Sequence, residues 1–302
     1  MAAKYTLRQL ELFSAAVRNE SFAGAADEMY VTPTAISVAV GELEKSFGVQ
    51  LVTRQRARGI LPTPAGLHLV ERAAKLLRDA GEIQRALSSG IGELSGPVSL
   101  GCYSTLAATI LPSLIHGFRE QYPGVDLAAS DGPADELLGR LLRGRLDLVI
   151  AYRSNLPPGL EEAVLYETSV HVLLPAGHRL ATHDVVSLKE LAEEPLIMLD
   201  LPPSGRHTLD MLQREGLTPS IAHRTPNFEL VRSMVARGLG YSLLVQKPSI
   251  DISYEGLPLV TREISPQFSQ EAAVIVWQKS LQLTDRAQAL VKYARKNVSA
   301  SQ

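Results

Sequence analysis

The hydrophobic pattern changes at Ser95-Gly96-Pro97, and this change limits the chain to a fold of two unlike parts. Before it, apolar residues recur at the three- and four-residue spacing of helices. After it, short apolar runs of strand length alternate with helical stretches, which is typical of a doubly wound α/β fold. The roughly 200 residues after the break are many for one such sheet. Two lobes with a cleft between them would suit that length.

The expected elements after the break follow from these alternating patterns. Strands are expected at 98–103, 125–130, 146–152, 170–174, 196–199, 220–224, 241–245 and 272–277. Helices are expected at 105–121, 133–143, 187–193, 207–215, 227–238 and 284–296.

Composition excludes several classes of protein. Hydrophobic residues make up 45% and charged residues 21% of the chain, which argues for a globular protein and against disorder. No apolar run approaches the ~18 residues of a membrane span, so no membrane partner is expected. The opening MAAKYTLRQLELF turns amphipathic at once, without a signal-peptide core. Cys102 is the single cysteine, so an intramolecular disulfide is excluded and we expect the reducing cytoplasm.

Local capping signals predict short helices in the first 50 residues. Thr6 and Gln9 have the spacing of a capping box. Ser21 is placed to cap a second, shorter helix, and Thr32-Pro33 reads as an N-cap followed by a proline at the first helical position. A helix, a tight turn and a further amphipathic helix are the arrangement of a helix-turn-helix.

The third of these helices has an apolar stripe that faces inward, formed by Ile36, Val40, Leu43 and Phe47. Residues off the stripe are expected to face the DNA major groove. They are Thr32, Pro33, Thr34, Ser37 and Val38.

An arginine-rich turn after this helix predicts a two-stranded wing. The net charge is −2, so any contact with DNA must be local. Residues 1–66 carry seven basic and six acidic side chains, so the useful signal is the cluster Arg54, Arg56 and Arg58. At the tip of a wing these arginines would reach phosphate or the minor groove.

A long helix is predicted at roughly residues 65–94, after Pro64. At 1.5 Å per residue it would be about 45 Å long. Its apolar residues follow a spacing close to a heptad seam, which indicates a dimerisation helix. The alternative is a long helix packed on its own domain. The seam consists of Leu69, Ala73, Leu76, Ala80, Ile83, Leu87, Ile91 and Leu94.

Several motifs in this order resemble the LysR-type family of bacterial transcriptional regulators. Residues 7–66 hold LRQLELF, SFAGAADEM, VTPTAIS, GELEKSFGVQLVTR and TPAG. The later GPVSLG, ILPSLIHGFREQYPGVDL, GRLDLVIAY and ELVRSMVARGLGYSLL are similar to the family's effector domain. The resemblance covers nearly the whole chain.

The resemblance implies an α/β two-lobed effector domain, similar to periplasmic binding proteins, preceded by an all-α winged helix-turn-helix domain and a long linker helix. The expected bounds are 1–64 for the DNA-binding domain, 65–95 for the linker and 96–302 for the effector domain. Lobe I would hold about 96–165 and 269–302, and lobe II about 166–268. A homotetramer, built as a dimer of dimers, is implied, with promoter DNA, a small-molecule effector and RNA polymerase as partners.

The chain departs from the family in its third helix. Members often carry basic or amide residues where Val38, Ala39 and Gly41 stand. We therefore expect the hydroxyls of Thr34 and Ser37 and the methyl groups of Val38 to read the bases. Pro62 replaces a more usual leucine, which leaves the second strand of the wing open.

Candidate effector contacts follow from the positions of strand ends and helix starts, where ligands of two-lobed α/β domains lie. Arg153 follows a strand and would pair with a carboxylate, although a surface salt bridge is the alternative. For Ser104 and Thr105 simple N-capping is the alternative. The prediction is a small, carboxylate-bearing metabolite contacted by Ser104, Thr105, Arg153, Ser204, Asn227 and Phe228.

Other features favour no catalytic residue, metal or cofactor. Cys102 lies in an apparently buried strand and is interpreted as core rather than as a redox sensor. His178 and His183 lie in a loop with too few further ligands for a metal site. Ser204 and His207 lack the pattern of a nucleophile elbow. The competing functions are an exported solute-binding protein and an α/β enzyme, and both are less consistent with the helix-turn-helix.

Overall fold

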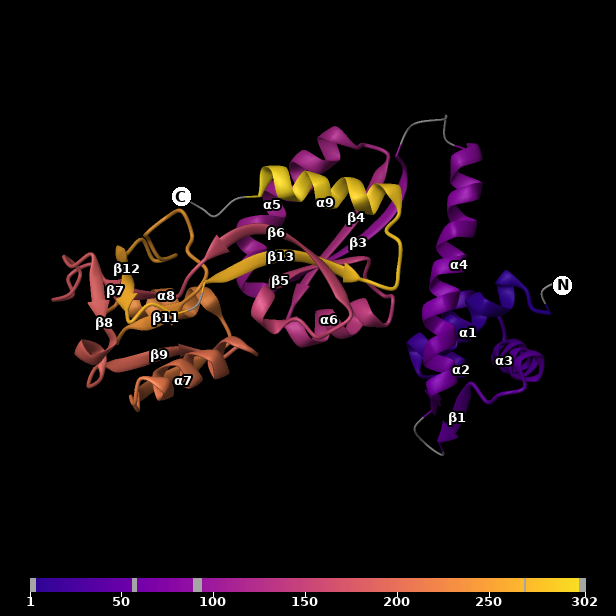
Figure 1. Ribbon diagram of the computed structural model, residues 1–302, viewed down its shortest axis with the longest axis horizontal. Helices are drawn as coiled ribbons and strands as arrows, with labels where there is room; N and C mark the ends of the chain where they lie inside the picture. Colours follow the sequence, from indigo (N-terminus) through magenta and orange to yellow (C-terminus); the bar gives the residue numbers. More distant parts are fainter. Residues whose placement is uncertain (1–3, 56–58, 89–93, 269, 299–302) are drawn as a thin grey trace.

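The computed structural model describes residues 4–55, 59–88, 94–268 and 270–298. A small helical domain and one long helix stand beside an elongated α/β part (Figure 1). The α/β part has two lobes, so the predicted fold class is confirmed.

The helical domain contains α1 (Leu7–Asn19), α2 (Phe22–Met29) and α3 (Pro33–Phe47). The predicted caps are present: Thr6 and Gln9 form a capping box, and the side chains of Ser21 and Thr32 each accept a backbone N–H of the first turn. The inward residues pack into one cluster around Phe13, Ile36 and Leu43. Phe47 differs from the prediction, because it is 39% exposed and lies against the ring of Tyr5.

The wing consists of β1 (Val52–Gln55) and β2 (Gly59–Pro62), paired antiparallel. Pro62 is the last residue of β2, where its missing N–H interrupts no further pairing. Gly59 has a φ of +83°, and a Cβ there would lie 2.1 Å from the carbonyl oxygen of Glu20. The same oxygen accepts the N–H of Ile60 at 2.9 Å. The wing is therefore fixed against the end of α1, and only glycine fits the contact.

The long helix α4 spans Pro64–Ser88, and its upper part projects beyond the short helices (Figure 1). Its first half differs from the prediction of a dimer seam, because Val70 and Ala73 are buried in the core of their own domain and Leu69 packs against it. Further along, Leu76 is 43% exposed. The intramolecular alternative thus holds for the first turns, and the exposed Leu76 lies beyond them.

Lobe I is built on a sheet with the strand order β4-β3-β5-β13-β6. The strands β3, β4 and β5 are parallel, whereas β13 runs antiparallel to both neighbours. Its strands are β3 (Gly96–Tyr103), β4 (Val125–Gly132), β5 (Leu148–Tyr152), β6 (Leu160–Thr168) and β13 (Glu271–Gln278), and its helices are α5 (Ser104–Gln121), α6 (Ala134–Leu142) and α9 (Asp285–Asn297).

Lobe II contains a sheet with the order β11-β7-β12-β8 and a parallel pair of β9 and β10. A bridge between Leu196 and Tyr241 connects the two sheets. The strands are β7 (His171–Pro175), β8 (Val185–Ser187), β9 (Pro195–Leu199), β10 (Ser220–Thr225), β11 (Ser242–Leu244) and β12 (Leu259–Ser265), and the helices are α7 (Ser204–Arg214) and α8 (Phe228–Ala236).

The sequence did not predict β6, β8 and β12. It also predicted a helix at 187–193, where the structure has a single 3₁₀ turn, Leu188–Leu191. A second such turn, Arg153–Asn155, follows β5. The predicted α5–α9 helices and the remaining strands agree to within a few residues.

One buried cluster spans both lobes. A single apolar cluster includes Leu106 and Ile150 of lobe I and continues into Leu199 and Val231 of lobe II. Trp277 packs against it while its Nε1–H donates to Glu161. Cys102 is fully buried in β3, as predicted. Within the described residues, no helix is both long and apolar enough to span a bilayer.

Lobe I also contacts the helical domain. The guanidinium of Arg145, in the turn before β5, donates to the carbonyl oxygen of Arg18 near the end of α1. Burial and nearby arginines lower the pKa of Arg145. Gly144 lies next to Ala74 of α4. This contact therefore joins the two parts of the chain close to Glu20, on which the wing rests.

Candidate functional site

The exposed face of α3 carries the residues predicted to meet DNA. Thr32, Pro33 and Thr34 are exposed at the start of the helix, and Val38 is 53% exposed one turn later. Because the opposite face is buried against α1 and α2, this face is free to enter a major groove.

Arg54 connects the wing to this helix. Its guanidinium donates to the hydroxyl of Ser37 at 2.8 Å and lies 5.3 Å from the centre of the Phe22 ring. Ser37 is half-buried, and its hydroxyl already accepts this hydrogen bond from Arg54. Arg56 and Arg58 lie outside the described residues.

Glu44 is a positioning residue that the sequence did not reveal. Its carboxylate accepts the backbone N–H groups of Leu51 at 2.8 Å and Val52 at 3.2 Å. The side chain thus holds the wing at a fixed place beside α3. A glutamate in the last turn of a helix gives no sequence signal for this contact.

A cavity of about 330 Å³ lies between the lobes, and we call it the interlobe cavity. Its size falls in the range of small-molecule sites. Thr105 and Tyr152 come from lobe I, and most of the other lining residues come from lobe II. The wall is formed by Thr105, Tyr152, Ser154, Val170, Leu199, Ser204, His207, Thr208, Asp210, Met211, Arg214, Phe228, Leu243, Leu244, Val245, Gln246, Phe268, Gln270 and Glu271.

Two hydroxyl groups in this wall are buried without a hydrogen bond of normal geometry to any described residue. They belong to Thr105 and Tyr152, which lie near each other. Burial raises the pKa of Tyr152, so its phenol is neutral and remains a donor. An unpaired buried hydroxyl costs about 1–3 kcal/mol, so this wall favours a polar occupant.

The helix starts at the interlobe cavity lack side-chain caps. The cap position of α5 is Tyr103 and that of α7 is Pro203, and neither makes a capping hydrogen bond. Their first backbone N–H groups therefore keep donor capacity beside the cavity.

Hydrogen bonds cross between the lobes around the cavity. The hydroxyls of Tyr103 in lobe I and Ser204 in lobe II lie 2.8 Å apart. Gln246 donates to Thr109 of α5 at 2.8 Å and accepts from Tyr166 at 2.9 Å. These bonds hold the lobes in the present arrangement, and any ligand that uses Ser204 must compete with Tyr103.

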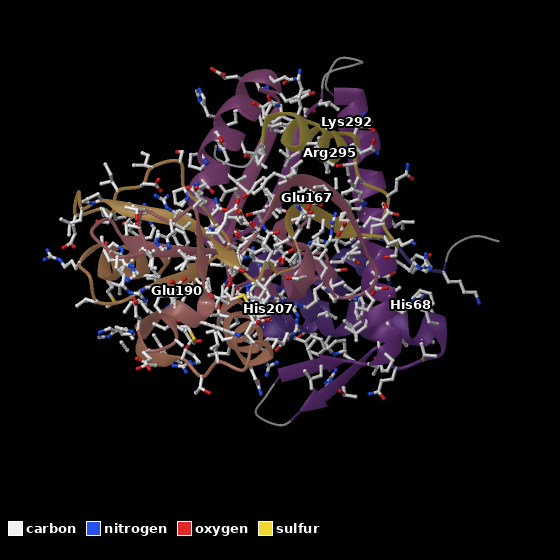
Figure 2. All side chains as sticks on the ribbon, turned by 60° about the vertical axis from the view of Figure 1, so that its left-hand side comes forward. His68, Glu167, Glu190, His207, Lys292 and Arg295 are labelled. Carbon is white, nitrogen blue, oxygen red and sulfur yellow. The ribbon has the colours of Figure 1, made fainter. Side chains whose placement is uncertain are left out.

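Charged side chains line the outer part of the cavity. His207, Asp210 and Arg214 are exposed on α7, and Figure 2 shows His207 where that helix faces the middle of the molecule. Glu271 differs from these three residues in that its carboxylate is held by backbone groups: it accepts the N–H of Ser154 at 3.2 Å and the N–H of Ala272 at 2.9 Å.

A second cavity, of about 890 Å³, lies between the starts of α5 and α8, and we call it the α5–α8 groove. Of the predicted effector residues, Ser104 and Asn227 line only this groove. Ser204 lines only the interlobe cavity, and Thr105 and Phe228 line both. The groove is lined by Ser104, Thr105, Ala108, Thr109, Leu201, Pro226, Asn227, Phe228, Glu229, Arg232, Pro248, Ser249, Ile250, Ile252, Ser253 and Tyr254.

Arg153 lines neither cavity. Its Nε donates to the Glu162 carboxylate at 2.8 Å, and its side chain is 43% exposed. This placement matches the surface salt bridge that was the alternative for Arg153. The structure thus brings together five of the predicted effector residues around adjoining cavities and leaves Arg153 outside.

The other candidate sites have structural partners. Burial raises the pKa of the Cys102 thiol, so a reactive thiolate is disfavoured. His178 is half-buried in its loop and contacts the carboxylate of Glu194 at 2.6 Å. No group of three metal-ligating side chains occurs in the described ranges.

Both parts of the chain match known families. Residues 7–67 match the family described as "Bacterial regulatory helix-turn-helix protein, lysR family". Residues 92–299 match the "LysR substrate binding domain". The chain belongs to the LysR family. It is a DNA-binding transcriptional regulator of that family with a substrate-binding domain for an effector, and LysR regulators are not enzymes.

Relatives of this LysR regulator extend over nearly all of it. HinK, a LysR family transcriptional regulator from Pseudomonas aeruginosa, has 38% identity and a TM-score of 0.65, over 98% of this chain and 99% of that one. The regulator TtuA of Agrobacterium vitis is 30% identical over 79% of each chain. Full-length OxyR from Pseudomonas aeruginosa has a TM-score of 0.73 at 23% identity, over 98% and 99%, and supports the fold alone.

Proposed function

We propose that a small, carboxylate-bearing effector bound in the interlobe cavity controls how this LysR regulator acts on promoter DNA. The observation that carries the proposal is the pair of buried, unpaired hydroxyls of Thr105 and Tyr152 in the cavity wall. Both can donate to a carboxylate oxygen. The proposed contacts are Thr105, Tyr152, Ser204 and Phe228.

Charge favours placing the carboxylate at the Thr105 end of the cavity. The uncapped starts of α5 and α7 lie there, and helix N-termini attract anions. Asp210 and Glu271 also line the wall and would repel a carboxylate, but the charge of Glu271 is partly taken up by the N–H groups of Ser154 and Ala272. Leu199, Met211 and Phe268 offer apolar contacts to the rest of the ligand.

On the DNA side, we propose that Thr32, Pro33, Thr34, Ser37 and Val38 face the bases. Arg54, Arg56 and Arg58 would contact the phosphate backbone of the DNA. A mobility-shift assay with the upstream intergenic DNA tests this role, and affinity should fall steeply as salt rises. Affinity that is insensitive to salt would contradict phosphate contact by the wing.

For assembly, we propose a homo-oligomer, a dimer of dimers, joined through the exposed part of α4 after Ala73. The exposed Leu76 supports this surface. We keep the limits 1–64, 65–95 and 96–302 for the domains. A regulator of promoter DNA acts where the chromosome lies, so we place it in the cytoplasm, with RNA polymerase as a further partner.

The proposed mechanism is closure of the lobes by the effector. Closure would change the packing of the dimers and hence the spacing and bend of the bound DNA. The effector must bind the two arrangements with unequal affinity to have this effect. Small-angle scattering with and without effector would detect the change in shape, and an unchanged profile on binding would contradict it.

The effector proposal is tested by a thermal-shift screen of small organic acids on the full-length protein. With an acid that raises the melting temperature, Thr105→Val and Tyr152→Phe should each weaken binding about tenfold, because each removes one donor. Arg153→Ala is the control and should keep the shift, since Arg153 lines neither cavity. Equal shifts in all variants would rule out these contacts.

A further inference from the structure

The α5–α8 groove has the dimensions of a ligand site of its own. Its volume of about 890 Å³ lies in the range of small-molecule pockets. It is formed by the first turns of α5 and α8 and by residues 248–254, which follow β11. Ala108, Asn227 and Ser253 line it without lining the interlobe cavity.

Ser253 shows that the groove is built for a polar partner. The residue is 4% exposed, and its hydroxyl has no hydrogen-bond partner within the described part of the chain. Such a hydroxyl is costly unless something bonds to it. Its backbone is fixed by hydrogen bonds with Leu257 and Gly256, so the side chain is held at the groove wall.

The groove is also rigid on its α8 side. Arg232 is 3% exposed and donates to Glu229 and to the carbonyl oxygens of Ile250 and Ile252, each at 2.8 Å. Glu229 further accepts the N–H of Tyr254 at 2.7 Å. The ion pair neutralises both charges and fixes the 248–254 segment against α8.

The chemistry of the wall indicates the class of ligand. The start of α5 has no side-chain cap, and its N–H groups favour an anion. The Asn227 carbonyl oxygen caps α8, which leaves its amide NH₂ as a further donor. The rim is apolar, since Ile250, Ile252 and Tyr254 are 62%, 49% and 87% exposed. These features suit a carboxylate attached to an apolar body.

We propose that the α5–α8 groove is a second ligand site, distinct from the interlobe cavity, which binds a small carboxylic acid with an apolar body. Its carboxylate lies against the start of α5 and the hydroxyl of Ser253. Thr105 and Phe228 form part of both walls and the start of α5 faces both carboxylates, so occupancy of the groove lowers the affinity of the interlobe cavity for its effector. By linkage the reverse effect has the same size.

The test uses the full-length protein and 4-fluorophenylacetate, observed by ¹⁹F NMR line broadening. The uncharged 4-fluorophenylacetamide is the matched probe, and it should bind more weakly because it lacks the carboxylate. Ala108→Phe fills the groove from an exposed position of α5 and should abolish the broadening. Ala128→Phe, at an exposed position of β4 outside both cavities, is the control and should leave it unchanged.

Two further variants separate this site from folding and from the interlobe cavity. Ser253→Ala should weaken the probe about tenfold without lowering the melting temperature, because it removes an unpaired hydroxyl. Thr208→Phe fills only the interlobe cavity and should leave groove binding in place. Broadening lost in Thr208→Phe but kept in Ala108→Phe would overturn the proposal. So would equal binding of both probes, or an Ala108→Phe protein that fails to bind and sediments as a smaller oligomer, which would make the groove a subunit interface.

Discussion

The DNA-binding domain and the effector domain are built on different principles. The helices of the DNA-binding domain are each started by a local side-chain cap, and their core is one cluster of residues from the first 77 positions. In the effector domain the cavities are formed by segments that lie more than 100 residues apart, such as Thr105 and Phe228. The first surface is thus set by local sequence and the second by long-range packing. Changes in the first should alter DNA affinity and not ligand binding, whereas changes in the second should alter ligand binding.

The largest expected effect is on the exposed face of α3. Val38→Glu places a negative charge next to phosphates, and DNA affinity should fall more than about a hundredfold, or ~3 kcal/mol. Val38 is 53% exposed, so the melting temperature should stay unchanged. Val185→Glu, at a 48% exposed position of lobe II, is the control and should retain affinity in a mobility-shift assay. Retained affinity in Val38→Glu would show that this face does not meet DNA.

Acid should distinguish the two domains next. Burial, together with Lys247 and Arg232, lowers the pKa of His171 in β7 from 6.5 to about 4. Between pH 6.5 and about 4, His171 is protonated in the unfolded chain but stays neutral in the folded one. The free energy of unfolding therefore falls as the pH falls towards 4. From about pH 7 to about pH 5 the loss is about 2 kcal/mol. This loss of stability should appear in the unfolding of the effector domain, which contains the buried His171. His68 of α4 is exposed (Figure 2).

Denaturant unfolding at both pH values measures this loss. His171→Gln should flatten the pH dependence, whereas His223→Gln, at an exposed histidine of the same lobe, should not. An unchanged pH profile in His171→Gln would assign the acid sensitivity to other groups.

Arg54→Gln should have a smaller effect on DNA binding. The change removes one phosphate contact together with the contacts to Ser37 and Phe22, so affinity should fall about tenfold. The slope of log affinity against log salt should decrease by about one. Arg206→Gln, at an exposed position of α7, serves as the control of equal charge change. If the slope of log affinity against log salt does not change, Arg54 does not contact the DNA phosphate backbone.

The smallest effects compare matching caps in the two domains. Thr32 and Thr284 each accept the N–H of the third helical residue, at 3.2 and 3.3 Å. Either change to Ala should lower the free energy of unfolding of its own domain by about 1 kcal/mol. Calorimetry measures both losses. Only Thr32→Ala should also weaken DNA binding. A similar loss of DNA affinity in Thr284→Ala would show that the stability of the effector domain also affects DNA binding.

The same contrast explains what the sequence could predict. Thr6, Ser21 and Thr32 are local signals, and the structure places a helix start at each of them. The strand β6 (Leu160–Thr168) was missed because it is partly exposed and charged at Glu161, Glu162 and Glu167. Its pairing partner β13 begins more than 100 residues later. No local pattern contains that information.

The candidate site shows the same limit. Strand ends and helix starts led to Thr105, Ser204 and Phe228, which do line the interlobe cavity. At the end of β5 the charged Arg153 was chosen, while the preceding Tyr152 is the residue in the cavity wall. Its phenol gave no signal, since only the fold shows that it is buried without a partner.

The end of α1 has a consequence for genetics. Glu20 adopts a left-handed backbone conformation with φ of +50° and supports the wing through Ile60, while Arg145 of lobe I reaches Arg18 two residues earlier. A movement of lobe I would therefore pull on the same corner that fixes the angle of the wing. Selections for regulators that ignore their signal, or act without it, should yield substitutions at these positions, outside both cavities.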